Sequence, residues 1–482
     1  MVFNSIAFAI FLPVVFALYW GVLGGRRRAQ NVLILAASYL FYGWWDWRFL
    51  GLVFASSLVD FLVGRRLPHA GSDRARRALM LTSLVANLGV LGFFKYFNFF
   101  IDSFADLVSL VGMQPNLPSL RIILPVGISF YTFQTLGYTI DVYKKRLEPS
   151  RDPVEFFAFV SFFPQLVAGP IERAAKLLPQ FGRDRSFTYE NAAKGMRQIL
   201  WGLFKKVVIA DNVAETVNLV FADPGSQSPV MLLVGLFLFA PQVYGDFSGY
   251  SDIAIGTARL FGFDLMRNFS FPYFARDINE FWRMWHISLT TWFRDYVFVP
   301  LSRKSLRSRH RRPRLALDFV ITFTLSGLWH GANWTFVIWG LLNGLYLVPA
   351  IFRGGEAKRS AVVAEGRFLP TPREAVQMLS TFMLCMTTAV FFRATSIEDV
   401  GTYLWGMVSK PWLPLPMLGF VKYHLIIGAG MLYAEWPMRA RQHGLDIGHL
   451  PRGVRWTLYM LCALAIAVLG NTGENQFIYF QF

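Results

Sequence analysis

Two histidines lie within strongly apolar stretches of the sequence and are the side chains best suited to chemistry. His330 ends the segment 322–330, and His286 lies in the tryptophan-rich segment 281–290, 44 residues earlier. An imidazole in a hydrocarbon environment is costly unless it has a partner or a function. A neutral imidazole can take the proton from an acceptor hydroxyl as that hydroxyl attacks a thioester. We therefore predict that His330 is a general base for acyl transfer; a structural histidine bonded to a neighbouring helix is the alternative.

The residues that precede His330 place polar groups on the same helical face. We predict a helix over 316–331, in which Thr322, Ser326 and His330 follow one another at a spacing of four residues. Gly327 is small enough to let another helix or a ligand approach the backbone. This pattern favours a polar stripe inside the membrane over a single isolated histidine.

Two side chains beside His330 could donate hydrogen bonds to an oxyanion that develops during acyl transfer. They are Trp329 and Asn333. No Gly-x-Ser-x-Gly turn is present in the sequence, so a serine acyl-enzyme is not expected.

The segment 278–300 is predicted to form a helix with two neighbouring stripes. The aromatic stripe consists of Trp282, Trp285, Leu289, Trp292 and Tyr296, and the polar stripe of Arg283, His286, Thr290 and Arg294. Such a helix suits the lining of a polar cavity. The alternative is an interfacial helix whose tryptophans and arginines lie at headgroup level.

A third polar cluster follows the apolar run 231–240. Asp246, Ser248 and Asp252 lie where a long helix is expected to cross or break. We predict that the two carboxylates orient a histidine or pair with Arg283 or Arg294. Ion-pair scaffolding without a catalytic role is the alternative.

The composition indicates the class of protein that must position these residues. The chain has 482 residues, of which 54% are hydrophobic and 16% charged, whereas soluble domains carry about 25% charged residues. We predict an all-α polytopic membrane protein with about eleven full crossings and additional re-entrant or interfacial helices. The candidate spans are 3–22, 30–50, 51–64, 78–101, 121–141, 154–172, 193–221, 228–260, 316–332, 334–352, 373–393, 418–437 and 454–470.

The positive charge is concentrated between the candidate spans. The net charge is +17, and the basic clusters lie at 26–28, 65–77, 144–146, 303–314, 353–359 and 439–441. This distribution follows the positive-inside rule, which places these loops in the cytoplasm and both termini on the outer side of the membrane. It also disfavours nucleic acid as a partner. The two cysteines, Cys385 and Cys462, lie in apolar runs and are expected to pack rather than bind metal.

Several segments resemble the membrane-bound O-acyltransferase (MBOAT) family, in particular its bacterial polysaccharide branch, which includes the integral-membrane component of alginate O-acetylation. The similar segments are 125–133, 163–173, 244–256, 268–291, 326–334 and 476–482. The resemblance implies a single domain over 1–482, with transmembrane helices in a ring around a central tunnel. It also implies that His330 is the family's central catalytic histidine and that His286 is a second histidine, which could position the substrate. The residues expected to line the tunnel are Trp282, Arg283, Trp285, Thr290, Arg294, Thr322, Ser326, Trp329, Asn333, Asp246, Ser248 and Asp252.

The same resemblance implies an acetyl relay across the bacterial inner membrane. The donor would be acetyl-CoA or an acylated carrier protein, with no tightly bound cofactor. The acceptor would be a periplasmic partner of the SGNH type, which acetylates an exported polysaccharide such as alginate. The polysaccharide export machinery and membrane lipids are the other expected partners.

The aromatic tail at 476–482 resembles a motif of envelope-acylating systems. We predict that the Tyr479 hydroxyl carries the acyl group transiently or docks the partner, with an aromatic membrane anchor as the alternative. Two other functions remain open. One is a transporter or flippase without acyl chemistry, and the other is an MBOAT enzyme that acylates another glycan, a lipid or a protein directly.

Overall fold

The computed structural model describes residues 1–113, 120, 122–167, 169–353, 360, 362–412, 419–471 and 477–478. Every regular element in these residues is helical, which confirms the predicted all-α class. The described chain forms two compact units. Unit 1 comprises residues 1–193 and 257–266, and unit 2 comprises residues 194–256 and 267–482.

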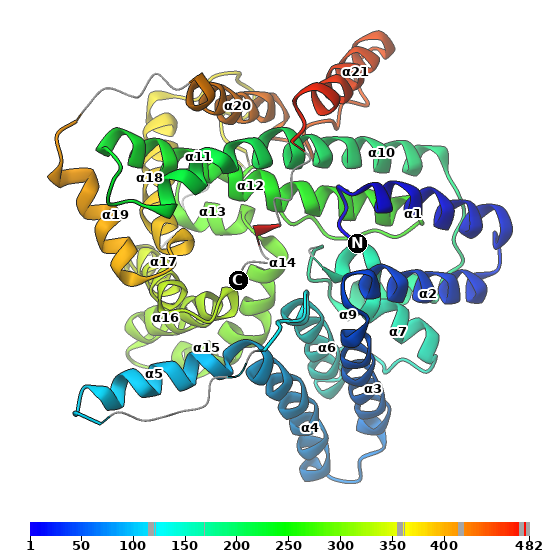
Figure 1. The fold of residues 1–482 in the computed structure, drawn as a ribbon. Helices are drawn as coiled ribbons and strands as arrows, with labels where there is room; N and C mark the ends of the chain where they lie inside the picture. Colours follow the sequence, from blue (N-terminus) through cyan, green and yellow to red (C-terminus); the bar gives the residue numbers. More distant parts are fainter. Residues whose placement is uncertain are drawn as a thin grey trace. The chain divides into compact units, whose positions relative to one another are not determined.

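Unit 1 is built around a buried carboxylate that joins three helices. The Asp60 side chain accepts hydrogen bonds from Ser83, from Asn87 (2.8 Å) and from Thr139 (2.7 Å). A charge taken out of water needs such partners, and these hydroxyl and amide groups supply them. The helices of this unit are α1 (Ile6–Ala17), α2 (Arg27–Asp46), α3 (Leu50–Arg66), α4 (Asp73–Leu91), α5 (Phe97–Ser109), α6 (Ile128–Tyr143), α7 (Pro153–Ser161), α8 (Phe163–Leu166) and α9 (Ala174–Phe181) (Figure 1).

Unit 2 begins within α10 and carries the predicted site. Its helices are α10 (Tyr189–Leu203), the π-helix η5 (Phe204–Ala210), α11 (Asp211–Ala222), α12 (Pro229–Leu260), α13 (Ile278–Met284), α14 (Ile287–Phe293), the π-helix η7 (Arg294–Phe298), α15 (Val299–Leu306), α16 (Arg311–His330), α17 (Trp334–Arg353), α18 (Pro372–Arg393), α19 (Ile397–Ser409), α20 (Gly419–Glu435) and α21 (Arg452–Leu469).

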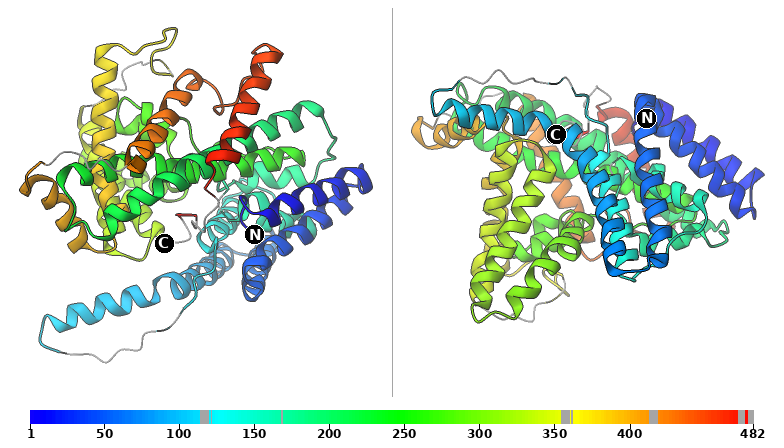
Figure 2. Two further views of the ribbon diagram at one scale, coloured as in Figure 1. Left: turned by 45° about the horizontal axis from the view of Figure 1, so that its top comes forward. Right: turned by 90° about the horizontal axis from the view of Figure 1, so that it is seen from below.

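The run from α10 through η5 to α11 lies along α12, as Figures 1 and 2 show. Glycine makes this close approach possible. A Cβ atom on Gly202 would lie 2.6 Å from the carbonyl oxygen of Gly249, and one on Gly249 would lie 2.8 Å from that of Gly202. Any larger residue at either position would therefore push the two backbones apart. The contact brings the side chains of η5 directly against those of α12.

A second close helix pair supports His330. Helices α16 and α17 lie side by side, and a Cβ atom on Gly327 would lie 3.0 Å from the Cα atom of Gly340. The predicted approach of another helix at Gly327 is thus confirmed. The predicted helix over 316–331 is also confirmed: α16 ends one residue before the predicted end, at His330, and begins five residues earlier than predicted, at Arg311.

The protein is a multi-pass membrane protein. Within the described residues, six helices are long and apolar enough to cross a membrane; they are Arg27–His69, Asp73–Ser109, Pro229–Leu260, Trp334–Arg353, Pro372–Arg393 and Arg452–Leu469. The number is smaller than the eleven or so expected, partly because the runs 30–50 and 51–64 belong to one long helical stretch. In the most apolar 18-residue stretch of α12, 78% is buried inside the protein. In the corresponding stretch of α21, only 6% is buried.

The prediction of one continuous helix over 278–300 is wrong. The helix is interrupted at Trp285 and His286, and it resumes as α14 and then as the π-helix η7. The cause is the segment 268–270, which forms hydrogen bonds with two backbone groups that a continuous helix would use. The amide of Ser270 donates to the Met284 carbonyl, and the amide of Ile287 donates to the Asn268 carbonyl, each over 2.9 Å. The single aromatic and polar stripes predicted for this segment therefore do not persist across the break.

Candidate active site

His330 lies buried at the C-terminal end of α16. The helix ends there because Gly331 is extended (φ −162°, ψ 152°). The ring of His330 is surrounded by other rings, with centroid distances of 5.0 Å to Trp329, 5.0 Å to Trp339 and 5.2 Å to Phe392. This aromatic environment holds the imidazole in a fixed orientation inside the protein.

His286 lies in the interruption between α13 and α14. Its backbone is left-handed (φ 41°, ψ 53°), a conformation that costs a residue other than glycine free energy and persists only when neighbours enforce it. Its ring packs edge-on against Phe247, with centroids 4.6 Å apart. Burial lowers the pKa of His286 to about 3, so its imidazole is neutral at pH 7.

Asn268 holds this turn in place. Its side-chain Oδ1 accepts from the Ser288 hydroxyl (2.9 Å), while its Nδ2 donates to the Ser251 hydroxyl on α12 (3.1 Å). The Asn268 carbonyl also accepts from Ile287, as described above. The left-handed backbone of His286 is thus fixed to α12 through one buried asparagine.

The fold brings the two histidines together. Their ring centroids are 6.4 Å apart, although the residues are far apart in sequence and belong to different helices. Trp329 contacts both histidine rings: its ring centroid is 5.0 Å from that of His330 and 6.0 Å from that of His286. Two imidazoles at this separation can act on one small reacting group.

His330 opens onto a cavity of about 50 Å³. Its lining consists of Phe239, Val243, Tyr273, Phe281, Trp282, Trp285, His330, Trp339, Asn343, Cys385, Met386, Thr388, Ala389 and Phe392. At 10–15 Å³ per water molecule, the space would hold roughly three to five waters. The cavity is therefore small and mostly apolar, with few polar groups near the imidazole, which suits a short acyl chain.

Trp282, which lines this cavity, carries a buried hydrogen-bond donor. The side chain is 8% exposed, and within the described residues its Nε1–H has no hydrogen-bond acceptor. A buried indole N–H normally finds an acceptor, so a substrate oxygen is a fitting partner. Trp285 lines the same cavity.

The other predicted site residues lie outside the lining of this cavity. Asn333 directly precedes α17; its Oδ1 accepts from the Thr335 amide (2.9 Å) and its Nδ2 donates to the Thr395 carbonyl (2.8 Å). Thr322 is buried and donates to the Asp318 carbonyl (2.6 Å). Ser326 is half-buried.

Arg283 and Arg294 are exposed, and Arg294 pairs with Asp295 over 2.8 Å. Thr290 is half-buried, and its hydroxyl donates to the Trp285 carbonyl (3.3 Å). Because the helix is broken at Trp285 and His286, Arg283, Thr290 and Arg294 do not lie on one helical face with His286.

The predicted pairing of Asp246 and Asp252 with Arg283 or Arg294 is wrong. Each carboxylate instead lies 2.7 Å from a lysine of η5: Asp252 pairs with Lys205, and Asp246 pairs with Lys206. The close packing of η5 on α12 explains this choice, because it places both lysines against the face of α12 that carries the acids. Sequence reasoning missed both lysines, although two charges inside the apolar run 199–210 are themselves a signal of an internal role.

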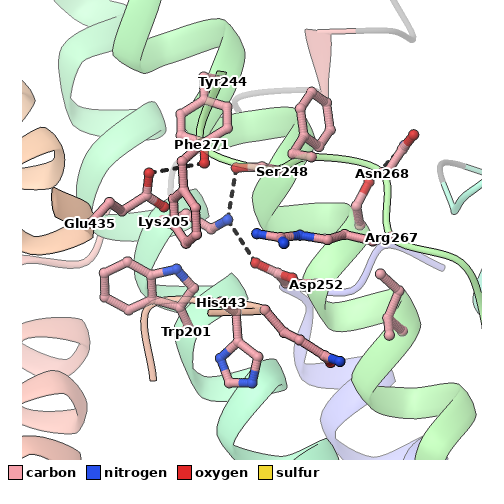
Figure 3. Close-up of a pocket in the computed structure, with 14 residues that line it drawn as sticks. Trp201, Lys205, Tyr244, Ser248, Asp252, Arg267, Asn268, Phe271, Glu435 and His443 are labelled. Carbon is pink, nitrogen blue, oxygen red and sulfur yellow. Dashed lines mark hydrogen bonds and ion pairs between the residues drawn. The ribbon is translucent and has the colours of Figure 1, made fainter. Parts of the chain in front are cut away.

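Figure 3 shows a second, polar cavity in which Lys205 lies between Ser248 and Asp252. Lys205 Nζ is 2.8 Å from the Ser248 hydroxyl, and on the other side the Tyr244 hydroxyl donates to Glu435 over 2.9 Å. The cavity measures only about 10 Å³, enough for roughly one water. Ser248 and Asp252 therefore belong to a tightly paired polar cluster rather than to the lining of the histidine cavity.

Within the described part of the chain, no group of three or more histidine, cysteine, aspartate or glutamate side chains could hold a metal ion. Tyr479, the predicted acyl carrier, and the rest of the tail after Ile478 lie outside the described residues.

The chain matches a protein-family model described as MBOAT, membrane-bound O-acyltransferase family, over residues 142–355, a range that contains both histidines. It is 40% identical over 405 residues to the probable alginate O-acetylase AlgI of Azotobacter vinelandii, covering 83% of this chain and 76% of that protein. It is 39% identical over 404 residues to the probable alginate O-acetylase AlgI of Pseudomonas aeruginosa (83% and 73%). A peptidoglycan O-acetyltransferase of Helicobacter pylori is 34% identical over 442 residues (85% and 80%).

The chain therefore belongs to the membrane-bound O-acyltransferase family. Membership makes it an acyltransferase enzyme and not a transporter without acyl chemistry. The family predicted from the similar segments is confirmed.

Proposed function

We propose that this enzyme moves an acetyl group from a cytoplasmic thioester donor through the membrane domain to a periplasmic SGNH-type partner, which acetylates an exported polysaccharide such as alginate. The observation that carries the proposal is the pair of histidine rings 6.4 Å apart, one of which, His330, lines a small apolar cavity. The similarity to probable alginate O-acetylases supports acetate as the acyl group and alginate as the polymer.

In the proposed reaction His330 is the general base. The acceptor hydroxyl gives its proton to the neutral imidazole as its oxygen bonds to the thioester carbonyl carbon. The carbon–sulfur bond then breaks, and the imidazolium returns the proton to the leaving sulfur, so that an ester and a thiol are formed. His286 remains neutral during this exchange and positions the substrate beside His330.

Trp282 is proposed to donate its free indole N–H to the thioester carbonyl oxygen. Negative charge develops on that oxygen in the tetrahedral intermediate, and a donor fixed in a buried cavity stabilises this charge without having to reorganise. This role fits Trp282 better than the earlier candidate Asn333, whose amide is used at the start of α17.

The proposal includes a hydroxyl carrier within the chain. Tyr479 would accept the acetyl group on its hydroxyl and pass it to the periplasmic partner, which requires the C-terminal tail to lie on the periplasmic side. The wider arrangement in this proposal comprises an inner-membrane location, a periplasmic N-terminus, about eleven crossings and a central tunnel. Acetyl-CoA and an acylated carrier protein are both acceptable donors.

A second candidate substrate has specific support. The peptidoglycan O-acetyltransferase of H. pylori matches this chain over a similar share of its length, with 34% identity. Peptidoglycan or another envelope glycan could therefore replace alginate without any change in the chemistry at His330.

The experiment compares wild type with three variants in a strain that lacks its own polymer acetylation but contains the export machinery and the periplasmic partner. The variants are His330→Ala, Tyr479→Phe and, as a matched control, His424→Ala. His424 is another buried histidine, bonded to Thr216 over 2.8 Å and not part of the cavity lining. The readout is ester-linked acetate on exported polymer at equal membrane abundance.

We expect His330→Ala and Tyr479→Phe to lose polymer acetate while His424→Ala keeps it. Undiminished acetate in His330→Ala would contradict the general-base role. Undiminished acetate in Tyr479→Phe would contradict only the carrier role. Supplying labelled acetyl-CoA or labelled acyl-carrier protein to the same membranes identifies the donor.

A further inference from the structure

The beginning of the C-terminal tail is buried in unit 2. Phe477 and Ile478 are 1% and 3% exposed. The Phe477 ring packs on Tyr250 of α12, with centroids 4.3 Å apart, and also contacts Phe247 at 5.9 Å. The tail is therefore packed into the helical unit at this point, and an anchor lying only at the membrane surface does not describe it.

One buried carboxylate fixes the position of this segment. The Ile478 amide donates to Oδ2 of Asp246 over 2.7 Å, and the other oxygen, Oδ1, lies 2.7 Å from Lys206 Nζ. Lys206 also pairs with Asp211 over 2.8 Å. A charge-assisted hydrogen bond to a carboxylate that is itself held by an ion pair is strong and directional.

The ring of Phe247 lies in contact with both the docked segment and His286. Phe247, the residue after Asp246, contacts Phe477 on one side and His286 on the other, with the His286 centroid 4.6 Å away. The sequence continues from Ile478 directly to Tyr479. The contacts thus link Asp246, the tail and His286 within one buried group.

We propose that the Lys206–Asp246 ion pair is an internal binding site for the C-terminal tail and sets the register of the tail beside the histidines. Asp246 is a positioning residue: it acts through the Ile478 backbone and not on the substrate. The docking rests on the contacts alone, whereas its importance for acyl transfer rests on the proposed function.

The chain contains a matched control for this site. Asp252 lies on the same helix, is half-buried with 13% of its side chain exposed, and pairs with the neighbouring lysine of η5, Lys205, over the same 2.7 Å. Its other oxygen accepts from Gln198 (2.7 Å) and not from the tail. Removing either carboxylate disturbs one buried lysine, but only the loss of Asp246 removes the bond to Ile478.

The experiment measures the exposure of the tail directly. In an Ile478→Cys protein purified in detergent, the rate of alkylation by N-ethylmaleimide reports release of the tail. We compare this parent with versions that also carry Asp246→Ala, Asp246→Asn or Asp252→Ala. The native Cys385 and Cys462 are both buried, so their alkylation reports general unfolding in the same sample.

We expect Asp246→Ala to raise the alkylation rate of Cys at position 478 at least tenfold while Cys385 and Cys462 stay protected. Asp246→Asn keeps an acceptor oxygen and should raise the alkylation rate less, by about threefold. This variant replaces Asp246→Ala if the alanine protein does not accumulate. Asp252→Ala should stay within twofold of the parent. Equal rates in parent and Asp246 variants, or equal increases for Asp246 and Asp252, would overturn the docking site.

Polymer acetylation measured on the Asp246 variants, with the native Ile478 restored, separates this inference from the proposed function. A released tail with lost acetylation supports both. A released tail with full acetylation would leave the docking site intact and contradict the need for the tail in acyl transfer.

Discussion

The two cavities of unit 2 differ in the kinds of side chain that line them. In the cavity around Lys205, the lysine bonds to Asp252 and Ser248, and Tyr244 bonds to Glu435, over 2.7 to 2.9 Å. Three other polar atoms of its lining, Trp201 Nε1, Arg267 Nε and Glu435 Oε1, have no hydrogen-bond partner among the described residues. In the cavity at His330, aromatic and aliphatic side chains dominate, and the Trp282 N–H has no acceptor among the described residues. Ion pairs between buried side chains stabilise a fold, whereas a small, mostly apolar cavity beside an imidazole suits the acyl group of a substrate.

The largest expected effect is a loss of stability when the Lys205–Asp252 ion pair of the polar cavity is broken. Lys205→Met removes the cation and leaves the Asp252 carboxylate, only 13% exposed, without its ion-pair partner. Removing one partner of a buried ion pair costs about 3–5 kcal/mol because the other charge remains uncompensated. We expect a much lower unfolding temperature in detergent and poor accumulation in membranes, measured by fluorescence-detected size-exclusion chromatography after heating.

The double variant Lys205→Met with Asp252→Leu sharpens this test. It removes both charges and should recover most of the lost stability, because an apolar replacement leaves no buried charge. If the single variant were as stable as wild type, the polar cavity would not be a scaffold, and the contrast between the two cavities would fail.

The intermediate effect is expected in the histidine cavity, on activity and not on stability. Trp282→Phe keeps an aromatic ring but removes the N–H donor, and we expect the acetylation rate to fall by about 10- to 100-fold, somewhat less than the loss of a typical oxyanion-hole donor. The comparison is made with Trp339→Phe, which also lines the cavity and packs on His330. Equal losses in the two variants would point to ring packing and not to hydrogen bonding as the role of Trp282.

Part of the histidine cavity can be predicted from the sequence, because the helix that carries His330 is specified by neighbouring residues along the chain. The helix ending at His330 follows from the apolar run, and its close partner helix follows from Gly327. The break at His286 could not be predicted, because it depends on bonds from residues 268–270, which compete with the helix for the Met284 carbonyl and the Ile287 amide. Helical periodicity contains no information about such a distant competitor.

The polar cavity could not be predicted in detail for a related reason. The positions of Asp246 and Asp252 in an apolar helix indicated internal partners, but the sequence offered arginines and lysines equally. The choice depends on the approach of α10 and η5 to α12 at Gly202 and Gly249, which places Lys205 beside α12. Arg294, by contrast, is exposed.

The smallest expected effect concerns the charge state of His286 and the pH dependence of stability. The pKa of His286 in the folded protein is about 3, below the value of about 6.5 expected in the unfolded chain. Because the unfolded chain binds the proton more readily, this histidine's contribution to stability is complete above pH 6.5 and is lost as the pH falls toward 3. The loss between pH 7 and pH 5 should be about 2 kcal/mol.

The measurement is the unfolding temperature in detergent at pH 7, 6 and 5 for wild type and His286→Gln. Other titrating groups affect both proteins alike, so the difference between the two slopes isolates His286. We expect the wild type to lose more stability on acidification than the variant. Parallel slopes would mean that His286 titrates normally and is therefore hydrated, which would contradict a neutral, buried imidazole beside His330.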